Sequence, residues 1–259
     1  MKKVLTVLLV LIVLIIGAIW YFMSSAGDFI RQEIEKQGTA YLGTPVAVSA
    51  VDVSYSDARM DITGTTVKNP QGFADDNAFS LGKVTLDLGG ATSEPYVIEN
   101  VTVDAPDILY EVNASAQSNL LVLKDNLQSN LPKQKSEPKT TESGQPMPRV
   151  IIENVTVSNA RLRLNFEQMD TSQLQLDIDQ KAYDVTLPTF NAGSIGKPDG
   201  LPADQVGAAI MNAMLDNVIK QAKSEAKDKL KDKARERIEQ EKDKLMDKAE
   251  DKLKGLFNK

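Results

Sequence analysis

The chain has 259 residues, of which 42% are hydrophobic, so one large domain or two small ones can bury a core. It contains neither Cys nor His, which excludes disulfides, thiolate and imidazole metal sites, Ser-His-Asp triads and histidine general bases. The net charge of -6 argues against nucleic acid as a partner, because phosphate binding needs a basic face. What remains is a non-catalytic protein or one whose chemistry relies on carboxylates, and we expect no metal or cofactor.

Residues 1–26 are predicted to form a cytoplasmic tip and a transmembrane anchor. Val4 to Met23 is an uncharged, mostly aliphatic run, which as a helix covers about 30 Å, the thickness of a bilayer core. Lys2 and Lys3 precede it, so the basic-side preference leaves the N-terminus in the cytoplasm and exports the rest. A cleaved signal peptide is the alternative, but its apolar core has only about 7 to 15 residues.

Residues 27–131 are predicted to be the first part of a β domain. A short amphipathic helix is expected over Gly27–Leu42, ended by Pro45. After it the apolar period changes to two, which is typical of a sheet with one solvated face. About nine strands are predicted, around Val46–Tyr55, Met60–Ile62, Val84–Leu88, Val101–Val103, Ile108–Val112, Val155–Val157, Leu162–Phe166, Leu174–Ile178 and Tyr183–Leu187.

An internal repeat lies within these strands. Ile98-Glu99-Asn100-Val101-Thr102-Val103 recurs identically at Ile152 to Val157, and each copy is followed by a turn and a second alternating strand. Such self-similarity indicates duplication, and we expect the duplicated unit to be a hairpin.

Two breaks divide the sheet. Asn69-Pro70-Gln71-Gly72 has the residues of a type I turn. Asn119 to Leu131 carries leucines at helical spacing and is expected to be a covering helix. Residues 132–149 are rich in Lys, Ser, Thr and Pro and are predicted to be a disordered linker, after which residues 150–200 form the second part of the β domain.

Residues 201–259 are predicted to be one long charged helix. Asp204 to Phe257 contains no Pro and is dense in Lys, Glu, Asp and Ala. Its first third is apolar, from Val206 to Ile219, and is suited to docking on the sheet. The remainder has only a thin apolar stripe, which is typical of a helix that recruits a partner and equally of a solvated helix held by Glu–Lys pairs.

The sequence offers few residues spaced for catalysis. Asp177 and Asp179 are spaced like a carboxylate pair, but alternate strand positions place both on the solvated face. The apolar face of the strands is more informative, because it is either closed by helices as an ordinary core or partly open as a groove for acyl chains. The candidate lipid-facing residues are Val84, Leu86, Leu88, Leu174, Leu176 and Ile178.

Several segments in this order resemble the N-terminal part of the AsmA-like family of Gram-negative inner-membrane proteins. They are the apolar N-terminal run, Val67–Phe73, Phe79–Leu88, Ile98–Val103 and Ile152–Val157. The resemblance implies a single-pass protein of the bacterial inner membrane that faces the periplasm and serves outer-membrane biogenesis. Larger relatives are thought to form β-sheet grooves that carry phospholipid, and the family supplies no catalytic residues.

The expected fold is therefore α+β. It has an N-terminal transmembrane helix, a twisted and mainly antiparallel β-sheet or open groove with amphipathic helices, and a long C-terminal helix. The expected function is lipid handling, with a phospholipid or other acyl lipid as ligand. The alternative is an envelope scaffold or adaptor that recruits an envelope protein through its C-terminal helix.

Overall fold

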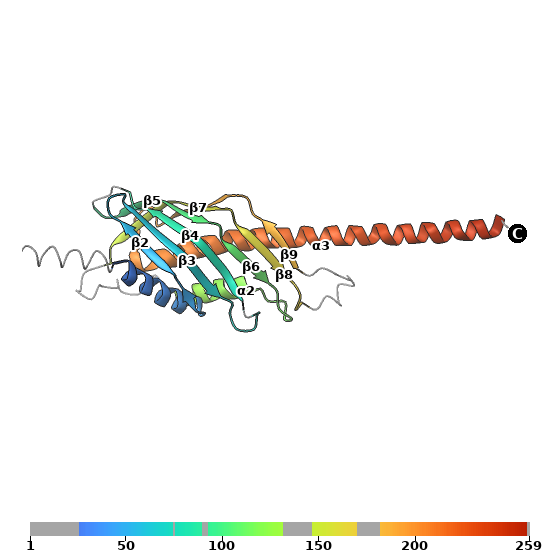
Figure 1. Cartoon of the computed structure of the whole chain (residues 1–259), viewed down its shortest axis with the longest axis horizontal. Coiled ribbons are helices and arrows are strands. Elements are labelled where there is room, and N and C mark those ends of the chain that lie inside the picture. The colour runs from blue at the N-terminus through green and yellow to red at the C-terminus, as the bar shows by residue number, and fades with distance from the viewer. Residues whose placement is uncertain (1–25, 75, 90–92, 132–146, 170–181, 258–259) are drawn as a thin grey trace, which may run out of the picture.

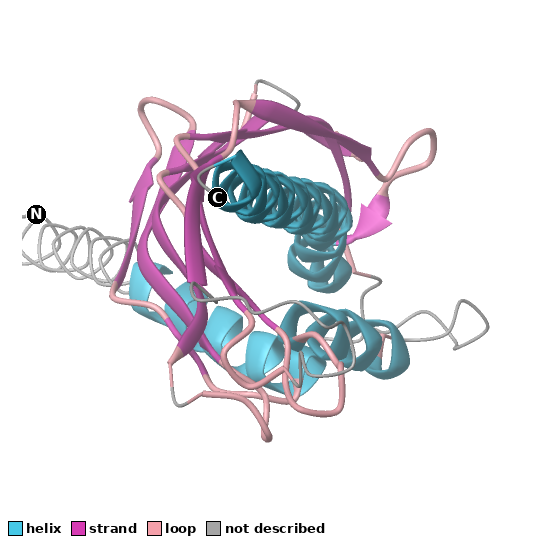
Figure 2. Cartoon of the chain, turned by 90° about the vertical axis from the view of Figure 1, so that its right-hand side faces the viewer, coloured by secondary structure: helices cyan, strands magenta, loops and turns pink. Residues whose placement is uncertain are grey.

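The computed structural model describes residues 26–74, 76–89, 93–131, 147–169 and 182–257. They form an α+β fold in which a curved sheet partly surrounds a long C-terminal helix (Figures 1 and 2). The predicted anchor and most of the predicted linker lie outside these residues. Among the helices in these ranges, none has the length and apolar composition required to cross a bilayer.

One sheet holds all the strands in the described part of the chain. Its strands are β1 (Val46–Ala47), β2 (Ala50–Ser54), β3 (Arg59–Lys68), β4 (Asn77–Asp87), β5 (Tyr96–Asp104), β6 (Asp107–Glu111), β7 (Arg149–Ser158), β8 (Arg161–Asn165), β9 (Ala182–Thr186), β10 (Phe190–Ile195) and β11 (Leu201–Pro202). The predicted strands that fall in described residues are confirmed, whereas β10 and β11 were not predicted. The predicted strand at Leu174–Ile178 lies outside the described residues.

Many of these strands are halves of longer ones. β5 and β6 pair with the same edge of β4 in one unbroken antiparallel register, from Lys83 opposite Asp104 to Phe79 opposite Ile108. β7 and β8 continue each other in the same way along the next row, with β10 and β9 beyond them. The sheet is therefore a set of long, interrupted strands that lie side by side.

The two copies of the internal repeat pair with each other in the sheet. Ile98 lies opposite Ile152 and Val103 opposite Val157 in the parallel pair β5–β7, and the same offset continues through β6–β8. The expected hairpins are therefore wrong at this place, because the two strands of each copy run end to end and pair with the other copy. These two parallel pairings make the sheet mixed, although most of its pairings are antiparallel.

A row of irregular residues crosses the sheet where the strands are interrupted. Gly64 on β3 lies opposite Gly82 on β4, followed by Ala105 and Asn159 in the next two rows. Gly64, Ala105 and Asn159 have φ values of 65°, 49° and 54°, outside the extended region. We call these four residues the break line.

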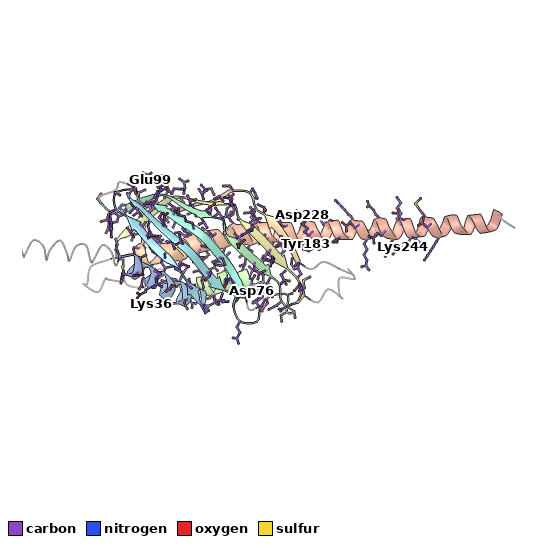
Figure 3. All side chains as sticks on the ribbon, viewed as in Figure 1. Lys36, Asp76, Glu99, Tyr183, Asp228 and Lys244 are labelled. Atoms are coloured by element: carbon purple, nitrogen blue, oxygen red, sulfur yellow. The ribbon has the colours of Figure 1, made fainter. Side chains whose placement is uncertain are left out.

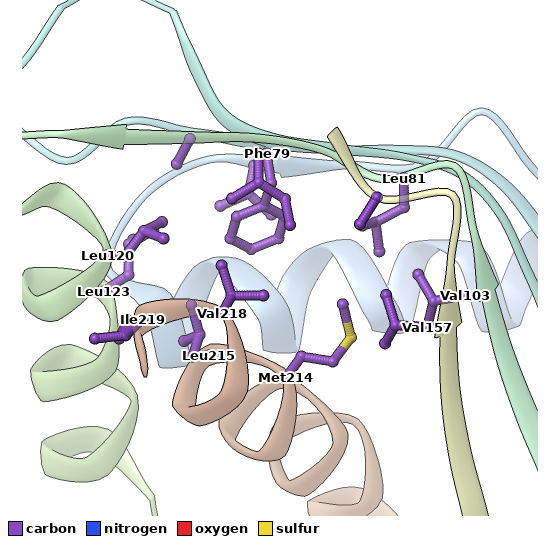
Figure 4. Close-up of a cluster of buried hydrophobic side chains, with 14 of the residues drawn as sticks. Phe79, Leu81, Val103, Leu120, Leu123, Val157, Met214, Leu215, Val218 and Ile219 are labelled. Carbon is purple, nitrogen blue, oxygen red and sulfur yellow. The ribbon is translucent and has the colours of Figure 1, made fainter. Parts of the chain in front are cut away.

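The break line changes the phase of the apolar alternation. Leu81 and Val84 lie on opposite sides of Gly82 and are three residues apart, so an uninterrupted strand would direct them to opposite faces. Both are buried in the same core. Figure 4 shows Leu81 and Val103, from opposite sides of the line, directed toward the same helix. The row of irregular residues thus lets both halves of the sheet present apolar side chains to one concave face.

Three helices cover that face: a helix over residues 26–42, α2 (Asn119–Asn130) and α3 (Ala203–Phe257). The first two agree with the predicted ranges within one residue. α3 begins two residues after the predicted start at residue 201, because Leu201–Pro202 pair with β7 as β11. The first turns of α3 lie inside the curve of the sheet, and the rest of the helix extends far beyond it (Figures 1 and 2). An ion pair between Lys124 of α2 and Asp216 of α3 joins two of the helices.

Candidate functional site: an apolar pocket beside the first helix

Most of the concave face is closed by α3. Met214, Leu215 and Val218 pack against Phe79 and Leu81, as Figure 4 shows. The void left between these residues and their neighbours is about 20 Å³, far too small for a lipid chain. Of the two arrangements considered for the apolar face, the structure therefore shows the closed core along the middle of the sheet, and the apolar first third of α3 supplies the cover.

Three of the six candidate lipid-facing residues lie in or beside this core. Val84 and Leu86 are buried, and Leu88 is half-buried against the same cluster. They share one face, as the alternation predicted, but that face belongs to the protein's own core. Leu174, Leu176 and Ile178 lie outside the described residues. Contact of any of the six with lipid stays a prediction.

An apolar pocket lies where the helices separate. It has a volume of about 310 Å³ and lies between the helix over residues 26–42, the end of α2 and the first turns of α3. Its wall is mostly hydrophobic and includes Ile34, Tyr41, Val67, Leu127 and Met211. Phe29, with 71% of its surface exposed, lies at its margin. The sequence indicated each of these helices but not the space between them.

An exposed glycine within α3 lines the pocket. A Cβ added at Gly207 would have no heavy atom within 4 Å, although the residue lines the pocket. Glycine inside a helix is about 1 kcal/mol less favourable than alanine, because it gives up more backbone freedom. Gly207 thus lowers the stability of the helix and leaves open space in the pocket wall.

The first helix is held against the sheet at its start and near its middle. A Cβ added at Gly27 would lie 2.2 Å from the carbonyl oxygen of Val51, so the start of this helix lies directly on the backbone of β2. Glu35 accepts a hydrogen bond from the backbone N–H of Val48 at 2.8 Å. These contacts fix one wall of the pocket against the sheet.

A buried polar network fixes α2, which forms another wall. Asn119, fully buried, donates hydrogen bonds from its amide group to the Leu109 carbonyl and to Asn69, both at 2.8 Å. Glu111 is 1% exposed and accepts hydrogen bonds from the Ala74 backbone N–H and the Asn69 amide, each at 3.1 Å. The Asn-Pro-Gln-Gly segment that sequence reasoning identified as a turn is thereby tied to the first turn of α2.

A polar cleft of about 690 Å³ lies on the outer face of the sheet. Its cations are already paired: Arg161 donates two hydrogen bonds to Asp107, at 2.5 and 2.7 Å, and Arg163 donates one to Asp184 at 2.9 Å. The hydrogen bonds that Arg161 donates to Asp107 and Arg163 donates to Asp184 raise the pKa values of the two arginines. Because the carboxylates neutralise the arginines, this cleft is a poor site for a lipid phosphate.

Across the described ranges, no group of three or more acidic side chains is arranged to hold a metal ion. Comparisons with protein-family models, with curated proteins and with solved structures give no match for this chain. The resemblance to the AsmA-like family therefore stays a prediction from sequence.

Proposed function

We propose that the pocket beside the first helix binds an acyl chain, and that the protein is a non-catalytic, membrane-anchored lipid-handling protein of the periplasm. In this proposal it serves outer-membrane biogenesis and takes a phospholipid or other acyl lipid as its ligand. The observation that carries the proposal is the apolar pocket between the three helices, which has open space beside Gly207 of α3.

The size and lining of the pocket support an acyl chain as the ligand. Its volume of about 310 Å³ is at the lower end of the range of small-molecule sites, about 300 to 1,000 Å³. Each methylene that leaves water for an apolar wall contributes about 0.8 kcal/mol. A pocket of this size suits part of one chain, with the headgroup left outside.

The place of the pocket in the chain supports a membrane source for that ligand. Phe29 at its margin is only six residues after Met23, the end of the apolar run that we propose as the inner-membrane anchor. A lipid in the adjacent leaflet would therefore be close to the pocket. The concave face itself is not part of the proposal, since α3 would have to leave before a lipid could enter there.

Photochemical cross-linking tests this function. The full chain is reconstituted into vesicles that contain a phospholipid with a diazirine near the end of one acyl chain, illuminated and digested for mass spectrometry. We expect adducts at pocket residues such as Ile34 and Met211. Gly207→Phe should fill the pocket and remove these adducts, whereas the matched control Gly207→Ala should keep them.

Two results would count against the proposal. Adducts confined to the apolar N-terminal run would show that lipid does not enter the pocket. Equal adduct yields at Ile34 and Met211 in the alanine and phenylalanine variants would show that the pocket is not the site of contact.

A second candidate function is the adaptor, and one observation favours it. α3 continues well past the sheet, where Ile238, Leu245 and Met246 are 67%, 67% and 62% exposed. An adaptor predicts that deletion of residues 224–259 abolishes recruitment of an envelope protein while the pocket adducts persist. Loss of pocket adducts in the Gly207→Phe variant with recruitment intact would separate the two functions.

A further inference from the structure

The exposed part of α3 carries an eleven-residue repeat. Lys231-Asp232-Lys233 recurs as Lys242-Asp243-Lys244, and Glu239 recurs as Glu250. Ala234 and Ile238 correspond to Leu245 and Ala249. Eleven residues complete slightly more than three helical turns, so residues one repeat apart lie on nearly the same side of the helix.

The repeat keeps an apolar stripe along the helix. Ala234, Ile238 and Leu245 follow at intervals of four and seven residues and fall on one side; we call these three residues the distal stripe. Ile238 and Leu245 are each 67% exposed. This segment lies past Tyr183 and Lys229, where the ring and the ammonium group are 5.9 Å apart and α3 leaves the sheet (Figure 3).

Charges are sorted around the distal stripe by sign. At about 100° per residue, basic side chains lie along both edges of the stripe and carboxylates lie on the opposite side. The basic residues are Lys231, Arg235 and Lys242 on one edge and Arg237, Lys244 and Lys248 on the other, whereas Lys233 lies farther from the stripe. The opposite carboxylates are Asp232, Glu236, Glu239, Asp243 and Asp247, and Glu241 is the one acidic residue at the edge of the stripe between residues 231 and 248.

We infer that this part of α3 binds an anionic phospholipid surface and lies in its headgroup layer. The distal stripe enters the boundary of the acyl chains. The Lys and Arg side chains extend their apolar stems along it and place their charges at the lipid phosphates. The carboxylates then face water, away from the anionic lipid. The sorting of charge identifies the partner, because a solvated helix has no need to keep carboxylates away from the edges of its apolar stripe.

The same sorting disfavours a second copy of the helix as the partner. Two such stripes packed together would bring basic edges against basic edges, and like charges placed across an interface oppose association. The local ion pairs do not prevent a lipid contact. Lys233 and Glu236 are 2.8 Å apart, but both side chains are substantially exposed, and pairs of this kind contribute little in water.

A single label on the stripe tests the inference. The chain has no Cys, so Leu245→Cys provides the only thiol for an environment-sensitive fluorophore. The full chain is held in phosphatidylcholine nanodiscs and titrated with vesicles of phosphatidylcholine, with or without phosphatidylglycerol. We expect a blue shift with the anionic vesicles, a much smaller one with the neutral vesicles, and reversal by salt, which screens the cations.

Two substitutions that each add one negative charge make the test specific to the stripe. Ile238→Asp places the charge on the stripe and should raise the concentration of anionic vesicles at half-maximal shift by about tenfold or more. Gln240→Asp places it on the water-facing side and should leave that concentration almost unchanged.

The inference is overturned if anionic vesicles leave the emission unchanged, or if both substitutions weaken binding equally. A shift that depends on protein concentration without vesicles would assign the stripe to a second copy. A shift that needs an added envelope protein would assign it to a protein partner. The label is distant from the pocket, so these results do not depend on whether the pocket binds an acyl chain.

Discussion

Two glycines in helices provide a matched test of the pocket. Alanine at Gly207 should stabilise the protein, because its methyl group enters open space and the helix gains about 0.5 to 1 kcal/mol from the better helix former. Alanine at Gly27 makes the same exchange in another helix but should destabilise the protein. Its Cβ would lie 2.2 Å from the Val51 carbonyl oxygen, so the helix must move away from β2.

The loss of unfolding free energy expected for Gly27→Ala follows from the packing of the first helix. A Cβ cannot remain within 3.0 Å of a backbone oxygen, so the start of the helix must move by the better part of an ångström. Forced shifts of this kind in packed regions cost about 1 to 3 kcal/mol, which exceeds the gain in helix propensity. The two variants are therefore expected to differ in the sign of the change in unfolding free energy.

Denaturant unfolding of the full chain in one fixed detergent, followed by circular dichroism, measures both values. The reasoning would be refuted if Gly207→Ala lowered the midpoint, since that result would mean that the site has no open space. It would also be refuted if Gly27→Ala raised the midpoint. Unchanged slopes would show that the variants alter stability and not the unfolded state.

Three further predictions concern the elements around the pocket. Leu123→Ala should cost about 2 to 5 kcal/mol in unfolding free energy, because Leu123 is fully buried, and the half-buried neighbour Leu121 should cost less. Asn119→Ala should cost about 1 to 3 kcal/mol, since it leaves buried partners without hydrogen bonds. The hydrogen bond from Thr85, 2.7 Å long, holds the pKa of Asp61 below its ordinary 3.8, so this contribution to stability is present above that pH and is lost as the pH falls through the lower value. Asp61→Asn should therefore flatten the acid limb of a stability profile, and an unchanged limb would contradict the assignment.

Local patterns predicted the elements well. The leucine spacing at residues 119–131 and the Pro-free charged segment after Pro202 gave helices whose ends match α2 and α3 within one residue. Alternation located most strands, since most of them have one more buried and one more solvated side. The repeat at Ile98 and Ile152 also proved structural, because the two copies pair in register.

Local sequence patterns could not predict how distant segments pair and pack. A turn between two alternating segments predicts a hairpin, yet Ala105 and Asn159 interrupt strands that continue in line. Whether the two segments fold back as a hairpin or continue in line is decided only by their pairing with the distant strand β4. The pocket depends on how three helices from distant parts of the sequence separate over the sheet. Gly207 was the one local signal for it, as a glycine inside a strong helix.

Counting retained lipid tests the central claim most directly. Gly207→Ala and Gly207→Phe variants of the full chain are purified in parallel, and acyl lipid per chain is measured by mass spectrometry after extensive washing. Lipid held around the N-terminal run contributes equally to both, so the difference reports the pocket. The account predicts about one more acyl lipid per chain in the alanine variant, and equal amounts in the two variants would contradict it.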